Sequence, residues 1–111
     1  MNRFVPDRGD VVWLNFSPQT GHEQAGHRPA LVLSPASYNG KSGLMLCCPI
    51  TSQIKGYPFE VPVGKGSRTK GVVLADQIRS LDWRTRRAAK KSKVGTEVVE
   101  QVLERARLLL R

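Results

Sequence analysis

The chain has 111 residues, which is enough for one modest domain, so residues 1–111 are treated as a single unit. Its formal net charge of +9 and isoelectric point near 10.3 predict a polyanionic partner: RNA, DNA, an anionic membrane or an acidic protein segment. The longest apolar runs, residues 44–48 and 108–110, are too short to span a bilayer, and residues 1–8 lack a signal-peptide pattern. We therefore expect a cytoplasmic protein with no membrane association.

Short apolar or alternating runs predict β-strands over residues 11–16, 30–34, 44–49, 59–63 and 72–75. Turn residues separate them: Asn39-Gly40, the run 64–67 and Lys70-Gly71 supply the positive φ angles that hairpins need. Residues 78–83 predict another strand, which the basic segment 84–94 can continue. We expect a mainly β (α+β) fold in which an antiparallel, strongly coiled sheet forms a small barrel.

The two cysteines, Cys47 and Cys48, are adjacent on one of these expected strands. Neighbouring strand residues point to opposite faces, so a bond between the two sulfurs is disfavoured and a reducing compartment is indicated. The cysteines have the wrong spacing for zinc, and His22 and His27 have no carboxylate cluster beside them. We expect no metal and no other cofactor.

The last segment changes to helical periodicity, with Thr96 as the expected N-cap. Glutamates lie in the first turn and arginines near the end, which is the order that a helix dipole favours. The expected apolar face consists of Val98, Val99, Val102, Leu103, Ala106, Leu109 and Leu110.

A polar segment with the sequence Gly21-His22-Glu23-Gln24-Ala25-Gly26-His27-Arg28-Pro29 leads into the strand expected at residues 30–34. Glycines allow the loop to bend, whereas Pro29 restricts Arg28 to an extended backbone. The guanidinium of Arg28 is therefore held at the start of the strand.

This segment resembles the MazF/PemK family of toxin endoribonucleases, as do Pro49-Ile50-Thr51-Ser52 and the segments 55–61 and 74–84. The resemblance covers most of the chain. It implies an SH3-like antiparallel β-barrel of the MazF/PemK/CcdB type with a C-terminal α-helix, a homodimer, and an acidic, MazE-like antitoxin. It also implies a sequence-specific, metal-independent endoribonuclease that cleaves single-stranded RNA, chiefly mRNA, to 2′,3′-cyclic phosphate and 5′-hydroxyl ends.

The resemblance implies two catalytic residues. Arg28 matches the family arginine that precedes proline in a Gly-x-Arg-Pro segment, and Thr51 matches the threonine after the third core strand. A guanidinium can hold two phosphate oxygens at once, and the threonine hydroxyl can donate to the same phosphate or to the leaving oxygen. The general base stays open: His27 and Glu23 are chemically capable, but electrostatic stabilisation with solvent- or phosphate-assisted proton transfer is the preferred mechanism.

A second set of residues is expected to bind RNA. The polar loop offers hydrogen-bonding groups to unstacked bases, other polar residues lie within or beside the matching segments, and the arginines adjoin the last of these. The expected set is Glu23, Gln24, His27, Ser52, Gln53, Lys55, Gln77, Arg79, Arg84 and Arg86. The lysines of the segment 84–94 contribute long-range attraction, and Trp13 and Trp83, which lie within strands, are expected to pack in the core rather than stack on bases.

One segment departs from the family pattern. Where family members often carry aspartates, this chain reads Trp13-Leu14-Asn15-Phe16-Ser17-Pro18, so the bases recognised by a relative do not transfer to it. Two rival functions remain open: a CcdB-like toxin that binds DNA gyrase without cutting nucleic acid, and a non-catalytic RNA-binding barrel in which Arg28 only positions a phosphate.

Overall fold

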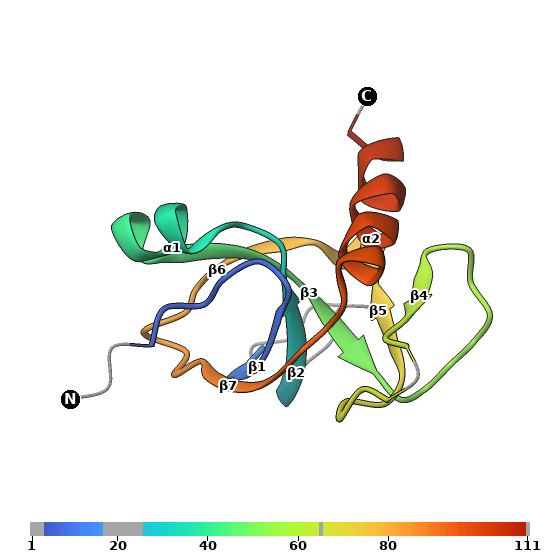
Figure 1. Ribbon diagram of the computed structural model, residues 1–111, viewed down its shortest axis with the longest axis horizontal. Coiled ribbons are helices and arrows are strands. Elements are labelled where there is room, and N and C mark those ends of the chain that lie inside the picture. The colour runs from blue at the N-terminus through green and yellow to red at the C-terminus, as the bar shows by residue number, and fades with distance from the viewer. Residues whose placement is uncertain (1–3, 17–25, 65, 111) are drawn as a thin grey trace.

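A computed structural model describes residues 4–16, 26–64 and 66–110 of the chain (Figure 1). Its elements are, in order, β1 (Asp10–Asn15), β2 (His27–Val32), α1 (Ala36–Ser42), β3 (Leu44–Thr51), β4 (Glu60–Pro62), β5 (Val72–Leu74), the 3-10 turn η1 (Ala75–Gln77), β6 (Arg79–Asp82), β7 (Ala89–Lys93) and α2 (Thr96–Leu108). No helix among the described residues is long and apolar enough to cross a membrane.

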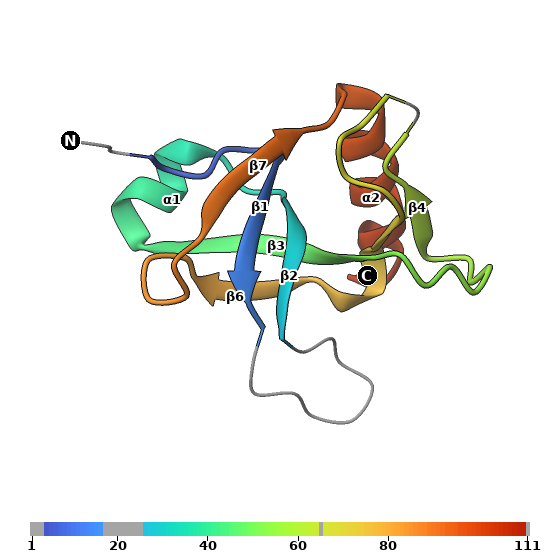
Figure 2. The same cartoon turned by 90° about the horizontal axis from the view of Figure 1, so that it is seen from below.

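The strands form a mainly antiparallel sheet in the order β4-β5-β3-β2-β1-β7, and β6 also pairs with β3. The long strand β3 joins the two parts: residues 44–47 pair with β6, and Ile50 and Thr51 pair with β5. In Figure 2, β3 runs behind β1 and β2 in a different direction, so the sheet is strongly coiled. The strand pairs of the described residues leave this sheet open. They confirm the antiparallel expectation but not a closed barrel.

Alternation along the strands separates two hydrophobic cores. Val11, Leu31 and Cys48 face the core that α2 covers, whereas Val12, Ala30 and Cys47 face the core on the other side. Cys47 and Cys48 are both buried and free, and they lie on opposite faces of β3 as expected. Burial raises the pKa of the Cys47 thiol to about 12 and also raises that of Cys48.

The helix α1 replaces the turn expected at Asn39-Gly40, so that expectation was wrong. Asn39 is fully buried, its side-chain amide donates to the carbonyl oxygens of Pro6 at 2.7 Å and Ser34 at 3.0 Å, and its Oδ1 accepts the Ser34 hydroxyl at 2.6 Å. Trp83 also donates its indole N–H to the Asn39 carbonyl at 2.9 Å. These contacts with distant residues favour a helix that ends at Gly43, which has a φ of 76°. Trp83 is a core residue, as expected.

The C-terminal helix α2 is present, but two details differ from the expectation. Its N-cap is Gly95, whose carbonyl accepts the N–H groups of Val98 and Val99, and Thr96 is already helical. Its buried face consists of Val98, Val99, Val102 and Ala106, whereas the leucines at its end are exposed. The helix runs beyond the sheet at this end, so Leu109 and Leu110 do not reach the core (Figure 1).

The basic segment 84–94 does not continue β6. A turn follows β6, with Arg87 at a φ of 55°, and the chain then returns as the separate strand β7 along β1. The expectation of one continued strand was therefore wrong. This return brings the lysines of β7 beside β1, which leads directly to the candidate site.

Candidate functional site

The two expected catalytic residues lie at the same end of neighbouring strands. Ala30 of β2 pairs with Pro49 of β3, and Arg28 and Thr51 lie two residues beyond this pair on their respective strands. Arg28 lies within β2, because this strand begins at His27, earlier than expected. Thr51 has by then turned to pair with Val72 of β5. The two residues thus pair with different strands, Arg28 with Leu14 of β1 and Thr51 with β5.

Arg28 lines a surface hollow of about 360 Å³, here called the arginine hollow. Its walls come from β1, β2, the end of β3, the segment before β5, and β7. They consist of Trp13, His27, Arg28, Pro29, Ile50, Ser52, Thr69, Lys70 and Lys91. The hollow has three cationic side chains, and no carboxylate is among its described lining residues. Such a surface suits a phosphate group.

Thr51 lines a second hollow of about 260 Å³, here called the threonine hollow, together with Gln53, Lys55, Gln77 and other residues. Thr51 is only 5% exposed, and its Oγ1 accepts the backbone N–H of Gln53 at 3.1 Å. The Glu60 carboxylate accepts the backbone N–H groups of Lys55 and Gly56 at 3.0 and 2.9 Å. The loop that carries Lys55 is therefore held in place, and four of the expected site residues line this hollow together.

The arginine and threonine hollows are connected through consecutive residues of β3 and the chain that follows it. Ile50 and Ser52 line the first, and Thr51 lines the second. Arg28 and Thr51 therefore do not share one hollow in a single chain. A ligand that contacts both must extend beyond either hollow alone.

Trp13 lies at the edge of the arginine hollow and is half-buried, outside both core clusters. The expectation that it packs in the core was wrong. Its ring stacks on the imidazole of His27, with centroids 5.3 Å apart and planes inclined by 10°, and Lys91 Nζ lies 5.6 Å from the ring centroid on the β7 side. Val12, Leu14 and Phe16 alternate into the core, so the strand pattern already assigned Trp13 to the opposite face, beside the polar Asn15.

Lys91 reaches Trp13 because β7 contains a β-bulge. Asp10 and Val11 pair with Lys93 and Ser92, but Val12 pairs with Lys90, which leaves Lys91 as the extra residue. Lys93 and Lys90 instead face the Asp10 carboxylate, whose side chain is 4% exposed, with N···O distances of 3.2 and 3.7 Å. Sequence periodicity alone gave no signal for the bulge, so the position of Lys91 was missed, as were Thr69 and Lys70.

His27 also lines a third hollow of about 680 Å³, here called the distal hollow, with Asn15, Ser80, Leu81, Asp82, Thr85, Arg86 and Arg87. Arg86 Nη1 donates to the Asn15 carbonyl at 2.7 Å, which fixes this arginine at its edge. His27 thus stands between the arginine hollow and the distal hollow, and both contain positive charge.

Two expected RNA-binding arginines lie elsewhere. Arg79 is half-buried, with its guanidinium 5.7 Å from the Phe16 ring, and its Nη1 is buried without a hydrogen-bond partner among the described residues. Arg84 lies over Trp83 at 4.7 Å and donates to the Gly40 carbonyl at 3.1 Å, beside α1. Neither lines a hollow with Arg28. Glu23 and Gln24 lie outside the described residues.

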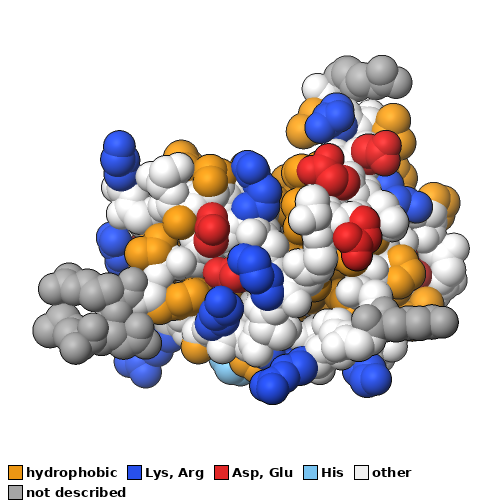
Figure 3. Space-filling view, in the orientation of Figure 1, with side chains coloured by type: hydrophobic (Ala, Val, Ile, Leu, Met, Phe, Trp, Pro, Cys, Tyr) orange, Lys and Arg blue, Asp and Glu red, His pale blue; other side chains and the backbone are white. Residues whose placement is uncertain are grey.

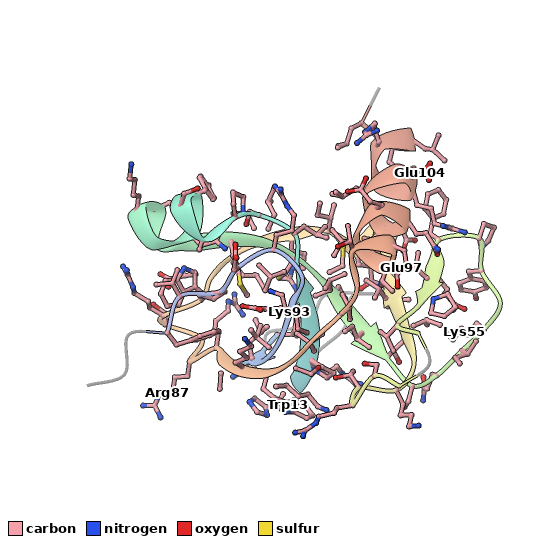
Figure 4. The ribbon with its side chains drawn as sticks, viewed as in Figure 1. Trp13, Lys55, Arg87, Lys93, Glu97 and Glu104 are labelled. Carbon is pink, nitrogen blue, oxygen red and sulfur yellow. The ribbon has the colours of Figure 1, made fainter. Side chains whose placement is uncertain are left out.

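Charge is unevenly distributed over the surface. Acidic side chains gather on α2 (Figure 3), where Glu97, Glu100 and Glu104 are exposed, whereas Trp13 marks the far end of the molecule from Glu104 (Figure 4). Within the described ranges, no group of three or more His, Cys, Asp or Glu residues could hold a metal ion. The arginine hollow, in contrast, is lined by Arg28, Lys70 and Lys91.

Comparisons with known proteins agree with this picture. Residues 7–110 match the family described as PemK-like, MazF-like toxin of type II toxin-antitoxin system. The endoribonuclease toxin MazF of Escherichia coli K12 is 51% identical over 110 residues, which cover 99% of this chain and 98% of that protein. The endoribonuclease PemK of Escherichia coli is 33% identical over 94% of this chain and 81% of its own length.

Solved structures give the same result. The crystal structure of MazF (Form-I) from Deinococcus radiodurans is 56% identical and superposes with a TM-score of 0.94 over 97% of this chain and 98% of that chain. The MazE-MazF crystal structure (Form-II) from the same organism is 56% identical, with a TM-score of 0.88 over 97% of both chains.

Proposed function

The chain belongs to the PemK-like, MazF-like toxins of type II toxin-antitoxin systems, and from this membership we propose that it cleaves single-stranded RNA, chiefly mRNA, at a short sequence. The observation that carries the proposal is the arginine hollow. Arg28, Lys70 and Lys91 line it together. Ser52 also lines it, and the residue before Ser52 is Thr51, which lines the threonine hollow. A reaction at phosphorus needs such positive charge where negative charge develops.

We propose that the ribose 2′-oxygen attacks the adjacent phosphorus, so that the O2′–P bond forms and the P–O5′ bond breaks. The products are a 2′,3′-cyclic phosphate and a 5′-hydroxyl. The 2′-hydroxyl proton passes to water or a phosphate oxygen, and the leaving 5′-oxygen takes a proton from water or from that phosphate oxygen. Arg28 holds two phosphate oxygens and neutralises the charge that develops on them. The balance is complete without a metal ion.

Thr51 acts from the other side of the β3 end in this proposal. The RNA backbone crosses at Ser52, so that the phosphate lies against Arg28 and the neighbouring nucleotide extends toward the threonine hollow. The Thr51 hydroxyl already accepts the Gln53 N–H, which directs its own proton outward as a donor. Gln53, Lys55 and Gln77 are then placed to contact the same strand.

The proposal includes protein partners. Relatives have been crystallised as MazE-MazF complexes, and an acidic antitoxin segment would compete with RNA for the same cationic hollows. A homodimer is proposed as well, since the exposed Leu110, just after α2, lines an apolar hollow of about 490 Å³ with the exposed Tyr38 and Leu46. The protein would act in the cytoplasm, where mRNA is translated.

We also propose that the coiled sheet is a small SH3-like barrel. β6 and β7 are the two edge strands around β1, β2 and β3, and they are consecutive in the chain. The Ala88 N–H donates to the Trp83 carbonyl at 2.9 Å in the turn between them, which brings these edges toward each other.

The test is incubation of the purified protein with a long single-stranded RNA in excess EDTA, beside the same RNA with 2′-deoxy substitutions, followed by mapping of the fragment ends. Discrete cuts with cyclic phosphate ends that disappear on 2′-deoxy substitution are expected. Absence of cutting across varied RNAs, with Arg28→Ala indistinguishable from the unsubstituted protein, would contradict the proposal. A DNA gyrase inhibition assay would then test the binding-toxin alternative.

A further inference from the structure

We propose that the exposed face of the His27 imidazole is a stacking surface for one RNA base, held in place by Trp13 and Lys91, and that His27 is not the general base. This inference rests on the proposed function. It assigns a base-binding position between the arginine hollow and the distal hollow. It also gives Trp13 a positioning role that the expectation of a core residue did not contain.

The geometry of three adjacent strands carries the argument. β7, β1 and β2 lie side by side and contribute Lys91, Trp13 and His27 in that order, with the lysine ammonium 5.6 Å and the imidazole centroid 5.3 Å from the Trp13 ring. The two rings are within 10° of parallel. One face of His27 is therefore covered by Trp13, and the other face is directed away from it. Such a stack extends naturally by one more flat ring, and the bases of single-stranded RNA offer one.

The positions of the charges favour RNA as the occupant. His27 lines both the arginine hollow, with Arg28 and Lys70, and the distal hollow, with Arg86 and Arg87. A nucleotide strand that passes from one hollow to the other would place phosphates against cations on both sides. The base between them would lie beside the imidazole. Stacking combined with a cationic path for the backbone is the usual arrangement at surfaces that bind single strands.

The β-bulge in β7 places Lys91 against Trp13 and so adds the third member of the stack. Without the extra residue, strand alternation would place Lys91 and Lys93 on one face, but the bulge leaves Lys90 and Lys93 on Asp10 and directs Lys91 to Trp13. β7 and β2 flank β1, so Lys91 and His27 approach the Trp13 ring from strands on opposite sides of β1. Both contacts restrict the orientation of the Trp13 ring, and the stacked His27 ring therefore has a defined orientation as well.

This position argues against acid–base chemistry by His27. A general base must reach the 2′-hydroxyl with a ring nitrogen in the plane of the imidazole. The stack on Trp13 instead leaves a flat face of the ring for a base, and we assign His27 to that contact. A base stacked on that face would be held for recognition, while the proton moves through solvent or phosphate.

The test is an abasic scan with short 2′-O-methyl RNAs of mixed sequence, which bind but cannot be cut because the nucleophile is blocked. In the unsubstituted protein, removal of one base should weaken binding about tenfold, the size of a single stacking contact. The same removal should cost nothing further in His27→Ala, and His27→Phe should restore the penalty because it keeps an aromatic face. If every abasic penalty is the same in His27→Ala as in the unsubstituted protein, the stacking surface is wrong.

Two further comparisons separate a positioning role from a merely structural one. Trp13→Leu should abolish the His27-dependent penalty and Trp13→Phe should retain it, at unchanged thermal unfolding midpoints. Lys91→Gln should weaken binding more than Lys90→Gln, which removes the same charge from the adjacent residue on the Asp10 side. Equal effects of the two lysine substitutions would contradict the role of the bulge.

Cleavage provides the last readout and distinguishes this inference from the proposed function. His27→Phe should keep the pH–rate profile of the unsubstituted protein in shape, whereas loss of its acidic limb, where a general base becomes protonated, with intact binding would identify His27 as the general base and overturn the inference. A protein that shows the His27-dependent penalty but cuts no RNA would refute the proposed function and support the stacking surface. A protein that cuts RNA without any such penalty would support the proposed function and refute the stacking surface.

Discussion

Gly71 lies so close to the backbone of Thr51 that a β-carbon on Gly71 would be 2.2 Å from the Thr51 carbonyl oxygen. The same glycine has a φ of 117°, which side chains rarely permit. Gly71 directly precedes β5, whose first residue, Val72, pairs with Thr51. The position of the proposed catalytic threonine thus depends on a residue that has no side chain.

Substitution of Gly71 by alanine is expected to destabilise the protein by more than about 3 kcal/mol, because it combines backbone strain with a clash against a main-chain oxygen. Gly66→Ala is the matched control, since its φ is 81° and nothing lies within 4 Å of its β-carbon position. It should cost only about 1 kcal/mol for the left-handed backbone. Urea unfolding of both variants measures the difference, and equal losses would contradict the close packing against Thr51.

Replacement of Arg28 is expected to act on cleavage rather than on folding, because its side chain is exposed at the start of β2. Arg28→Lys keeps the charge but loses the planar pair of donors, and we expect a fall of about 100-fold in the single-turnover rate, with a larger fall for Arg28→Ala. Lys41→Ala, which removes an exposed charge from α1, serves as the control. Rates of Arg28→Lys within a factor of two of the unsubstituted protein would show that only charge matters.

For Thr51, two substitutions distinguish the contribution of the hydroxyl from that of the methyl group. Thr51→Ser retains the hydroxyl that accepts the Gln53 N–H, so cleavage should remain within about tenfold, whereas Thr51→Val should lose about 100-fold. The valine variant should also lose about 1 kcal/mol of stability with the hydrogen bond. Single-turnover cleavage and thermal unfolding measured together check both effects. Cleavage by Thr51→Val at the rate of Thr51→Ser would exclude a role for the hydroxyl.

The buried thiols predict a loss of stability at alkaline pH. Burial raises the pKa of Cys47 to about 12, above the value of about 8.5 for an exposed thiol in the unfolded chain. Above about pH 8.5 the unfolded chain releases a thiol proton that the folded protein keeps. The free energy of unfolding is therefore highest below about pH 8.5 and decreases as the pH rises toward 12. Urea unfolding between pH 7 and 10 measures the slope. Cys47→Ala should reduce it, and an unchanged slope would contradict the assignment.

The same thiols should resist alkylation. Neither Cys47 nor Cys48 should react measurably with iodoacetamide at pH 8 in the folded protein, because both are buried and stay protonated. Both should react in denaturant. Rapid modification of the native protein would show that β3 opens far more often than its packing on both faces suggests.

The strands other than β7 followed from the sequence to within a few residues, because alternation at Val12, Leu14 and Phe16 or at Val61 and Val63 reports burial directly. α1 did not follow, since Asn39 has the local preferences of a turn and becomes helical only when its side chain is buried against Pro6 and Ser34. Local sequence cannot encode a contact with a segment that lies 33 residues away.

The candidate site was predictable where its residues are close in sequence, but not where it depends on contacts between distant segments. Thr51, Gln53 and Lys55 are close in sequence, and the structure places them in one hollow with Gln77. The lining of the arginine hollow by Lys70 and Lys91 depends on the return of β7 along β1 and on one extra residue in that strand. Neither the return nor the bulge leaves a periodic mark in the sequence. Arg79 and Arg84 look equivalent to Arg86 in the sequence, but the face of β6 and the turn after it send them to Phe16 and α1.

The glutamates of α2 also affect how the molecule meets its partner. On α2 the exposed Glu97, Glu100 and Glu104 outnumber Arg105 and Arg107, so a chain with a net charge of +9 has one slightly acidic helix and therefore an electric dipole as well as a charge (Figure 3). In the field of a polyanion, the dipole exerts a torque that turns α2 away and the cationic hollows inward before contact. The acidic helix therefore narrows the range of encounter orientations, and salt should slow capture more than it shortens the lifetime of the complex.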